Sequence, residues 1–405
     1  MKAAINQRII VWAAAIVCQV VIAGCGDMAE QKENARSRWQ NATCDIRISS
    51  ANEQFNQGLY SDAENTVSKC VEAGFESAEA HFLLGKIMFV KGDYQQARQH
   101  LLKAVELDDQ MHQGWYWLGM QAAETKDYRN ACNYYHRAMA LQPGNIDYIL
   151  NTVRTSIDLG QSNEAQQLLE DKMLIMPSNV SIKITAADLM LRLGRTNQAI
   201  RLYEQAALLN DDEQILESLA YCYMLEDNWE AAAKLFEKLV EKNQNASQEE
   251  QTKALVDLLA MCNMNAGRYT KAAASYGKLA VMQRDNADVW LKMGQAALGS
   301  QEAEKALVCS RKALSLRPGW DDAIALQGCA EYLAGRFDNA INSFEKIAAN
   351  QAYEGFSWFM QAKCCQHLGQ HKKAQHALTK AQQLSPDSKF VGLTIKSDEL
   401  GDSEK

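Results

Sequence analysis

Apolar residues recur at intervals of three and four along nearly the whole chain, the spacing that places them on one face of an α-helix. The clearest stretch is residues 112–145, HQGWYWLGMQAAETKDYRNACNYYHRAMALQPGN, in which the polar segment ETKD separates two such runs. Small residues at Gly119 and Ala131 would allow two helices to approach closely, and Tyr135 would fill the space between them. Pro143 cannot continue a helix and marks the end of the second one. The stretch therefore predicts a pair of packed helices joined by a tight turn.

This order of helix, tight turn, second helix and proline stop within 34 residues resembles a tetratricopeptide repeat. It departs from that family at Ala122, where the family prefers Tyr. With the turn glycine as position 15 and the small residue of the second helix as position 20, ten repeats follow. The expected repeats are residues 44–77, 78–111, 112–145, 146–179, 180–212, 213–246, 253–286, 287–320, 321–354 and 355–388. The resemblance implies an all-α fold, a right-handed α-solenoid of about ten helix-turn-helix repeats.

The register of the repeats breaks once, because residues 247–252 (SQEEQT) are extra. Ser247 and Glu250 have the spacing of a capping box, which predicts that the first helix of the seventh repeat begins early, near Ser247. The alternative is a solvated linker between two smaller arrays. Residues 389–405 are expected to form a C-terminal cap and a polar tail, since a repeat array needs a polar end.

Residues 1–24 have the pattern of a secretory signal peptide. Lys2 and Arg8 precede an apolar run from Ile9 to Val21, which is too short to span a bilayer comfortably. The segment ends in Ile-Ala-Gly-Cys, which resembles the bacterial lipobox and implies cleavage before Cys25 and lipidation of that residue. The alternatives are an ordinary signal peptide with a chance cysteine, or a retained anchor helix. Residues 25–43 would then be the lipidated Cys and a polar tether.

The lipobox also implies a location. A lipoprotein of this kind is anchored in the bacterial cell envelope, on the periplasmic side of a membrane. Gly26 follows the cysteine, in place of the Asp that favours retention in the inner membrane of enteric bacteria. We therefore expect the outer membrane rather than the inner one.

Composition and charge exclude several functions. The net charge is −8 and the chain has no basic stripe, so nucleic-acid binding is not expected. The chain has 11 cysteines but no C-x-x-C pair, and the cluster between Cys364 and His376 should not converge in the repeat geometry, so neither a metal nor another cofactor is expected. The sequence shows no phosphate-binding glycine loop, nucleophile elbow or H-E-x-x-H motif. We therefore expect no catalytic residues and no enzymatic activity.

Cys44 and Cys70 occupy positions 1 and 27 of the first repeat. The two helices of a repeat are antiparallel, so the start of one lies beside the end of the other. The two cysteines could therefore meet the Cα separation that a disulfide requires, and an exported protein is oxidised. The alternative is that both are small residues that fill a helix contact.

The resemblance implies a concave groove lined by positions 2, 5, 9, 12 and 13 of the first helices. At 5, 9 and 12 this chain is unusually apolar for a solvated surface. The aromatic and methionine residues expected in a partner-binding groove are Phe82, Phe89, Tyr116, Met120, Tyr221, Met224, Met261 and Met264. Such side chains suit a surface that adapts to varied apolar segments. The alternative is that tight curvature packs them on one another.

These features indicate a lipid-anchored scaffold or adaptor whose groove binds a protein or peptide segment with apolar residues. Lipoproteins of this kind resemble assembly factors for pili, outer-membrane proteins or exported polysaccharide. The alternative function is a periplasmic, chaperone-like accessory to an enzyme system such as cytochrome maturation.

Overall fold

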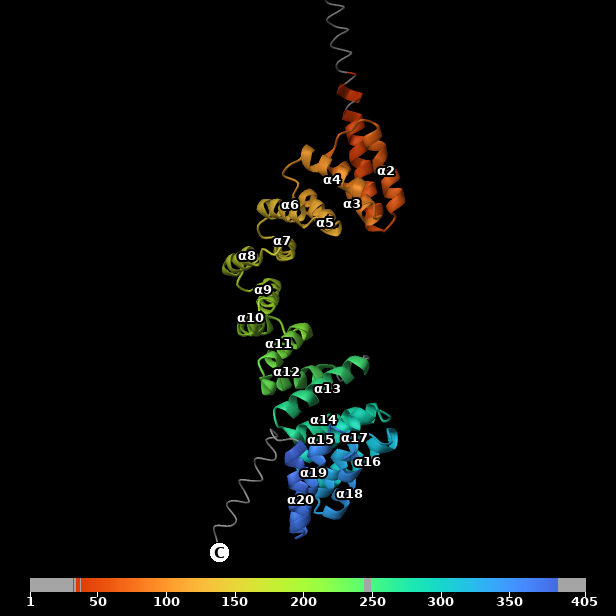
Figure 1. Cartoon of the computed structure of the whole chain (residues 1–405). Coiled ribbons are helices and arrows are strands. Elements are labelled where there is room, and N and C mark those ends of the chain that lie inside the picture. Colours follow the sequence, from red (N-terminus) through yellow and green to blue (C-terminus); the bar gives the residue numbers. More distant parts are fainter. Residues whose placement is uncertain (1–31, 33, 37, 244–248, 385–405) are drawn as a thin grey trace, which may run out of the picture. The chain divides into compact units, whose positions relative to one another are not determined.

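The computed structural model describes residues 32, 34–36, 38–243 and 249–384. All regular elements among these residues are helices that pair as hairpins (Figure 1), so the expected all-α array is confirmed there. A first helix covers residues 38–56. It is followed by α2 Tyr60–Glu72, α3 Ala78–Val90, α4 Tyr94–Leu107, α5 His112–Glu124, α6 Tyr128–Leu141, α7 Ile146–Asp158, α8 Ser162–Ile175, α9 Val180–Arg192, α10 Thr196–Leu209, α11 Glu213–Leu225, α12 Trp229–Asn243, α13 Glu249–Asn265, α14 Tyr269–Met282, α15 Ala287–Gly299, α16 Ala303–Leu316, α17 Asp321–Leu333, α18 Phe337–Ile347, α19 Glu354–His367 and α20 His371–Leu384.

The chain divides into two compact units, residues 1–185 and 186–405, and the division falls within α9. In the first unit α3 packs on α4, α5 on α6 and α7 on α8, and α4 and α6 also pack on the hairpin that follows. The second unit repeats this arrangement from α10 to α20. Within each unit most helices therefore contact their hairpin partner and the neighbouring hairpin, as in a one-dimensional array.

Short polar side chains begin several helices. The Asp93 carboxylate accepts a hydrogen bond from the Gln96 backbone N–H at 3.0 Å, and Asp127 caps α6 in the same way through the Asn130 N–H at 3.3 Å. These bonds satisfy N–H groups that have no partner within the helix. Side-chain caps therefore set where these second helices start.

The tight turns require a left-handed residue between the two helices of a hairpin. Gly92 fills this place in the second repeat with φ of 83°, a conformation that glycine adopts without steric cost. Lys126, Asp227 and Gln301 hold the same place in other repeats, with φ between 54° and 62°. The array therefore imposes the turn even where the residue does not favour it.

Close packing of the hairpins depends on small residues. A Cβ added at Gly119 would lie 2.5 Å from two ring atoms of Tyr135, whose side chain is buried. No such atom fits at that distance, so α5 and α6 can approach this closely only with glycine at this position. The sequence-based role of Gly119 is thereby confirmed.

Two helices extend beyond the usual length. The described part of α13 has 17 residues, whereas α11 and α15 have 13 each. The first helix includes residues 38–43, which the sequence assigned to the tether, so Cys44 lies inside a helix and not at its start. Ser247, the signal peptide (residues 1–24), Cys25 and the C-terminal segment (residues 389–405) lie outside the described residues. No described helix is long and apolar enough to cross a membrane.

Candidate partner-binding groove

One face of α3 gathers aromatic side chains around a lysine. Phe82, Lys86 and Phe89 follow one another at helical spacing and are all half-buried. The Lys86 Nζ lies 4.3 Å from the ring centroid of Phe55, 5.5 Å from that of Phe82 and 5.6 Å from that of Trp117. A cation at these distances is attracted by the electron-rich ring faces. Burial lowers the pKa of Lys86.

The same aromatic face continues onto α5. The ring of Phe89 meets Trp117 edge-on at 5.4 Å and Tyr94 edge-on at 5.4 Å. The two expected groove residues Phe82 and Phe89 therefore lie in one group, which we call the Lys86 cluster: Phe55, Phe82, Lys86, Phe89 and Trp117. Its members come from the first helix, α3 and α5.

Tyr116 and Met120 lie on α5, and both are half-buried. The ring of Tyr116 is 4.8 Å from that of Tyr148 on α7, and its hydroxyl accepts a hydrogen bond from Asn151 Nδ2 at 3.3 Å. Burial and the nearby Asp147 carboxylate raise the pKa of Tyr116. The phenol therefore stays neutral at physiological pH. Met120 packs beside the buried cluster of Ala122, Ala131 and Tyr135.

The other four expected groove residues belong to the second unit. Tyr221 is 42% exposed, and its ring meets Phe236 edge-on at 5.9 Å. Met261 is half-buried. Met224 and Met264 are half-buried too, and both pack against the core that contains Phe236. These four residues therefore lie at the surface, and Tyr221, Met224 and Met264 rest on the buried core beneath them.

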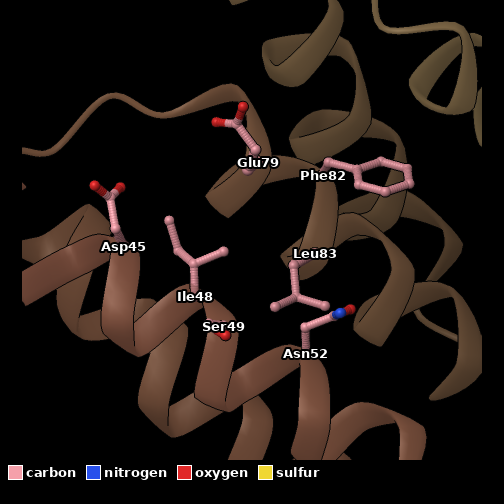
Figure 2. Close-up of a pocket in the computed structure, with 7 residues that line it drawn as sticks. All are labelled: Asp45, Ile48, Ser49, Asn52, Glu79, Phe82 and Leu83. Atoms are coloured by element: carbon pink, nitrogen blue, oxygen red, sulfur yellow. The ribbon is translucent and has the colours of Figure 1, made fainter. Parts of the chain in front are cut away.

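A pocket of about 460 Å³ lies between the first helix and α3. Its lining residues are Asp45, Ile48, Ser49, Asn52, Glu79, Phe82 and Leu83. Figure 2 shows Asp45 on the first helix and Glu79 on α3, with Ile48 in the space below them and Leu83 beneath Phe82. Asp45 and Glu79 are exposed, Ile48 and Phe82 are half-buried, and Leu83 is buried. The pocket therefore has an apolar interior and two carboxylates at its edge.

Most of the pocket residues were not predicted from the sequence. The predicted groove used positions 5, 9 and 12 from the second repeat onward, and of the pocket residues it includes only Phe82. Asp45 and Glu79 occupy position 2 of the first and second repeats, and Ile48 occupies position 5 of the first. Reading position 2 and including the first repeat would have found the pocket.

Cys44 and Cys70 do lie together. Both thiols are free and buried, and the Cys70 Sγ lies 3.7 Å from the Cys44 carbonyl oxygen. Burial, together with the neighbouring Cys44, raises the pKa of Cys70 to about 11. The disulfide between them stays a prediction.

The cysteines and histidines near the C-terminus have separate surroundings. Cys364 is buried, whereas the exposed His367 stacks on Phe337 with ring centroids 4.6 Å apart. His376 instead meets Trp358 edge-on. Across the described residues no group of three or more His, Cys, Asp or Glu side chains is placed to hold a metal ion.

A histidine pair joins α3 to α4. His81 Nδ1 and His100 Nδ1 are 3.0 Å apart, and the rings stack with centroids at 5.3 Å. One nitrogen must donate and the other accept, so the contact requires an unprotonated acceptor. Burial lowers the pKa of both imidazoles, and His100 and Lys103 lower that of His81 further, against a smaller opposite effect of Glu76.

We therefore expect acid to destabilise this hairpin. The unfolded chain protonates histidine near pH 6.5, and the lowered folded-state pKa means that the unfolded state binds more protons below that value. The free energy of unfolding then falls as the pH drops through about 6.5 towards the folded pKa. Thermal melts of the first unit's helices between pH 8 and pH 5 measure this slope. His100→Gln should reduce this dependence of the melting temperature on pH, whereas His371→Gln, at an exposed site, should leave it unchanged. Equal pH dependence in the two variants would contradict the prediction.

Comparison with known proteins identifies the repeats. Four segments match models of the tetratricopeptide repeat: residues 78–110, 190–256, 287–319 and 357–388. In these segments the chain carries tetratricopeptide repeats. Stacked helical repeats of this kind form extended surfaces of the type used for binding.

A tetratricopeptide repeat-containing protein of Caenorhabditis elegans, trd-1, is 27% identical over 97 residues, which are 24% of this chain and 13% of that protein. Solved structures align at low identity. PilF of Pseudomonas aeruginosa is 18% identical, with 53% of this chain and 98% of that chain covered and a TM-score of 0.42. A tetratricopeptide repeat protein of Parabacteroides merdae is 15% identical (62% and 98% covered, TM-score 0.37). MamA of Desulfovibrio magneticus is 16% identical (42% and 97% covered, TM-score 0.37).

Proposed function

We propose that the chain is a lipid-anchored scaffold that binds a protein partner through its concave groove and acts in envelope assembly or secretion. The observation that carries the proposal is the exposure of the groove residues. Large apolar side chains at helix contacts, such as Phe236 and Phe344, are fully buried. The eight expected groove residues are instead half-buried or exposed. Apolar side chains that the fold leaves accessible, in a repeat array of this kind, favour partner binding over packing alone.

The groove test uses Tyr221→Ser with Met261→Ser. Tyr221 is 42% exposed and Met261 half-buried, so removing them should cost little folding stability. The wild-type chain would be used to capture partners from envelope extract, and the partner identified by mass spectrometry would be purified for affinity measurement. The double change should weaken binding at least tenfold, which corresponds to about 1.4 kcal/mol.

The matched control is Leu208→Ser with Val281→Ser. These residues are 88% and 66% exposed and lie on α10 and α14, the second helices of their hairpins. The two control substitutions remove apolar surface outside the groove and should leave the affinity for the partner within twofold of the wild-type value. Unchanged binding by the groove variant would exclude this part of the groove, and a collapsed melt would show that its residues belong to the core.

The lipid anchor rests on the signal-like segment and on Cys25. Several acyl chains bind a membrane firmly, since each buried CH₂ contributes about 0.8 kcal/mol. Intact mass of the membrane-extracted protein should show the loss of residues 1–24 and the addition of acyl groups. Cys25→Ala should release the chain into the soluble fraction. A soluble, unmodified wild-type chain that begins elsewhere would rule out the anchor.

A further inference from the structure

We infer that the pocket between the first helix and α3 takes a basic side chain of the bound partner segment, with an apolar residue beside it. This inference rests on the proposed function, because it names what one part of the groove recognises. It is carried by the composition of the pocket, by its charge and by its size.

The charge at the pocket edge is negative and not neutralised by neighbours. Within the described part of the chain neither Asp45 nor Glu79 forms an ion pair, whereas Glu64 on α2 pairs at 2.6 Å with Lys91 at the other end of α3. Glu79 accepts a single hydrogen bond from the Ser77 hydroxyl at 2.6 Å. Both carboxylates are exposed, and they stand on the two different helices that line the pocket (Figure 2). Two free carboxylates at one opening are complementary to a guanidinium or ammonium group.

The interior of the pocket suits the apolar stem of such a side chain. Ile48, Phe82 and Leu83 line it, and Ile48 packs against the buried core that contains Leu83. Arg and Lys bury their methylene stems on apolar surface while the charged head stays at the polar edge. The pocket therefore matches a basic side chain along its length as well as at its end.

The volume indicates more than one side chain. About 460 Å³ lies within the range of roughly 300–1,000 Å³ typical of ligand pockets and exceeds what one arginine fills. Ser49 and Asn52, on the first helix, add polar groups that can form hydrogen bonds with a peptide backbone. An extended segment that places a basic and an apolar residue side by side would fill this space.

The experiment selects peptides from a random heptapeptide display library on the purified full-length chain. The enriched peptides should carry Arg or Lys next to an apolar residue. A synthetic copy of an enriched peptide should bind the double variant Asp45→Lys with Glu79→Lys at least tenfold more weakly than it binds the wild-type chain. Replacing its basic residue by Glu should abolish binding to wild type and restore binding to that variant. A restored complex also shows that the variant is folded.

Two further variants complete the test. Asp62→Lys with Glu72→Lys makes the same charge change on α2, outside the pocket, and should keep the affinity within twofold. Asp45→Asn with Glu79→Gln keeps the shape of the pocket and should lose binding without a shift in melting temperature. Enriched peptides without basic residues, or full binding by the pocket variants, would overturn the inference.

The groove variant Tyr221→Ser with Met261→Ser separates the two hypotheses. Peptides that depend on Tyr221 and Met261 but not on Asp45 and Glu79 would overturn the pocket inference and support the groove. Peptides that depend on neither set of residues would contradict both.

Discussion

Phe236→Ala should lower the free energy of unfolding of the second unit by about 3–5 kcal/mol, the usual cost of deleting a buried phenyl ring. Phe236 lies on α12 and is 0% exposed. It belongs to a buried cluster that also contains Leu239, Leu259 and Tyr276, drawn from α12, α13 and α14. Neighbouring hairpins therefore lose a shared contact, and the cavity cannot close without moving helices. Hydrogen exchange read helix by helix during urea unfolding measures the loss.

The control for this change is Leu225→Ala. Leu225 is 69% exposed at the end of α11 and should cost no more than about 0.5 kcal/mol. Helices α11 to α14 should lose protection first in Phe236→Ala, while the helices of the first unit keep theirs. Equal effects of the two substitutions would contradict the assignment of Phe236 to the core.

Tyr221 connects this core to the groove. Its ring lies edge-on against Phe236 at 5.9 Å, so Phe236→Ala should also disturb the groove. Tyr221→Ser removes a partly exposed ring and leaves the cluster beneath it filled. The two changes therefore separate a binding defect that arises from lost stability from one that arises at the surface.

The fold could be predicted from the sequence because the same physical requirement is repeated along the chain. Gly119 and Tyr135 specify one close helix contact, and equivalent pairs recur at nearly constant spacing. The turns are encoded less uniformly. Lys126 adopts the left-handed conformation with φ of 60° although nothing in its side chain favours it, so only the phase of the neighbouring repeats locates that turn.

Helix ends and site contacts were harder to predict. Residues 38–43 are mostly polar, and their one large apolar side chain, Trp39, is 70% exposed, so no buried apolar period marked their continuation of the first helix. Spacing predicts Met224 and Met264 for the concave face, but it does not predict their contact with the core, which depends on the distance between hairpins. The pocket at Asp45 and Glu79 depends in the same way on two helices from different repeats, each unremarkable by itself.

The final prediction concerns the first hairpin. Protein isolated from an oxidising compartment should contain a disulfide between Cys44 and Cys70. The structure places the Cys70 Sγ 3.7 Å from the Cys44 carbonyl oxygen, and the residues are 26 apart in sequence. Closing a loop of this length stabilises the folded state by about 3.5 kcal/mol in the chain-entropy model. The gain matters most at an end of the array, where a hairpin has one neighbour and not two.

The chemistry indicates when this bond forms. Two thiols give up two electrons and two protons to a disulfide oxidant, and the attacking species is a thiolate. Burial raises the pKa of Cys70 to about 11, so in the packed hairpin this sulfur is almost entirely the thiol at neutral pH. We therefore expect oxidation during folding, before the first helix and α2 bury both sulfurs. Reductant added to the folded protein should act slowly, because its thiolate must reach a buried sulfur.

Non-reducing peptide mapping after alkylation in denaturant, which exposes the buried thiols, decides whether the bond exists. Urea unfolding with and without dithiothreitol, after full equilibration, should show the first helix, α2 and α3 losing protection earlier when reduced. Cys44→Ala with Cys70→Ala supplies the control, since its unfolding should not respond to dithiothreitol. Alkylation of both cysteines in protein taken directly from its native compartment would refute the pairing. The two sulfurs would then serve as small buried residues that let the first helix pack closely on α2.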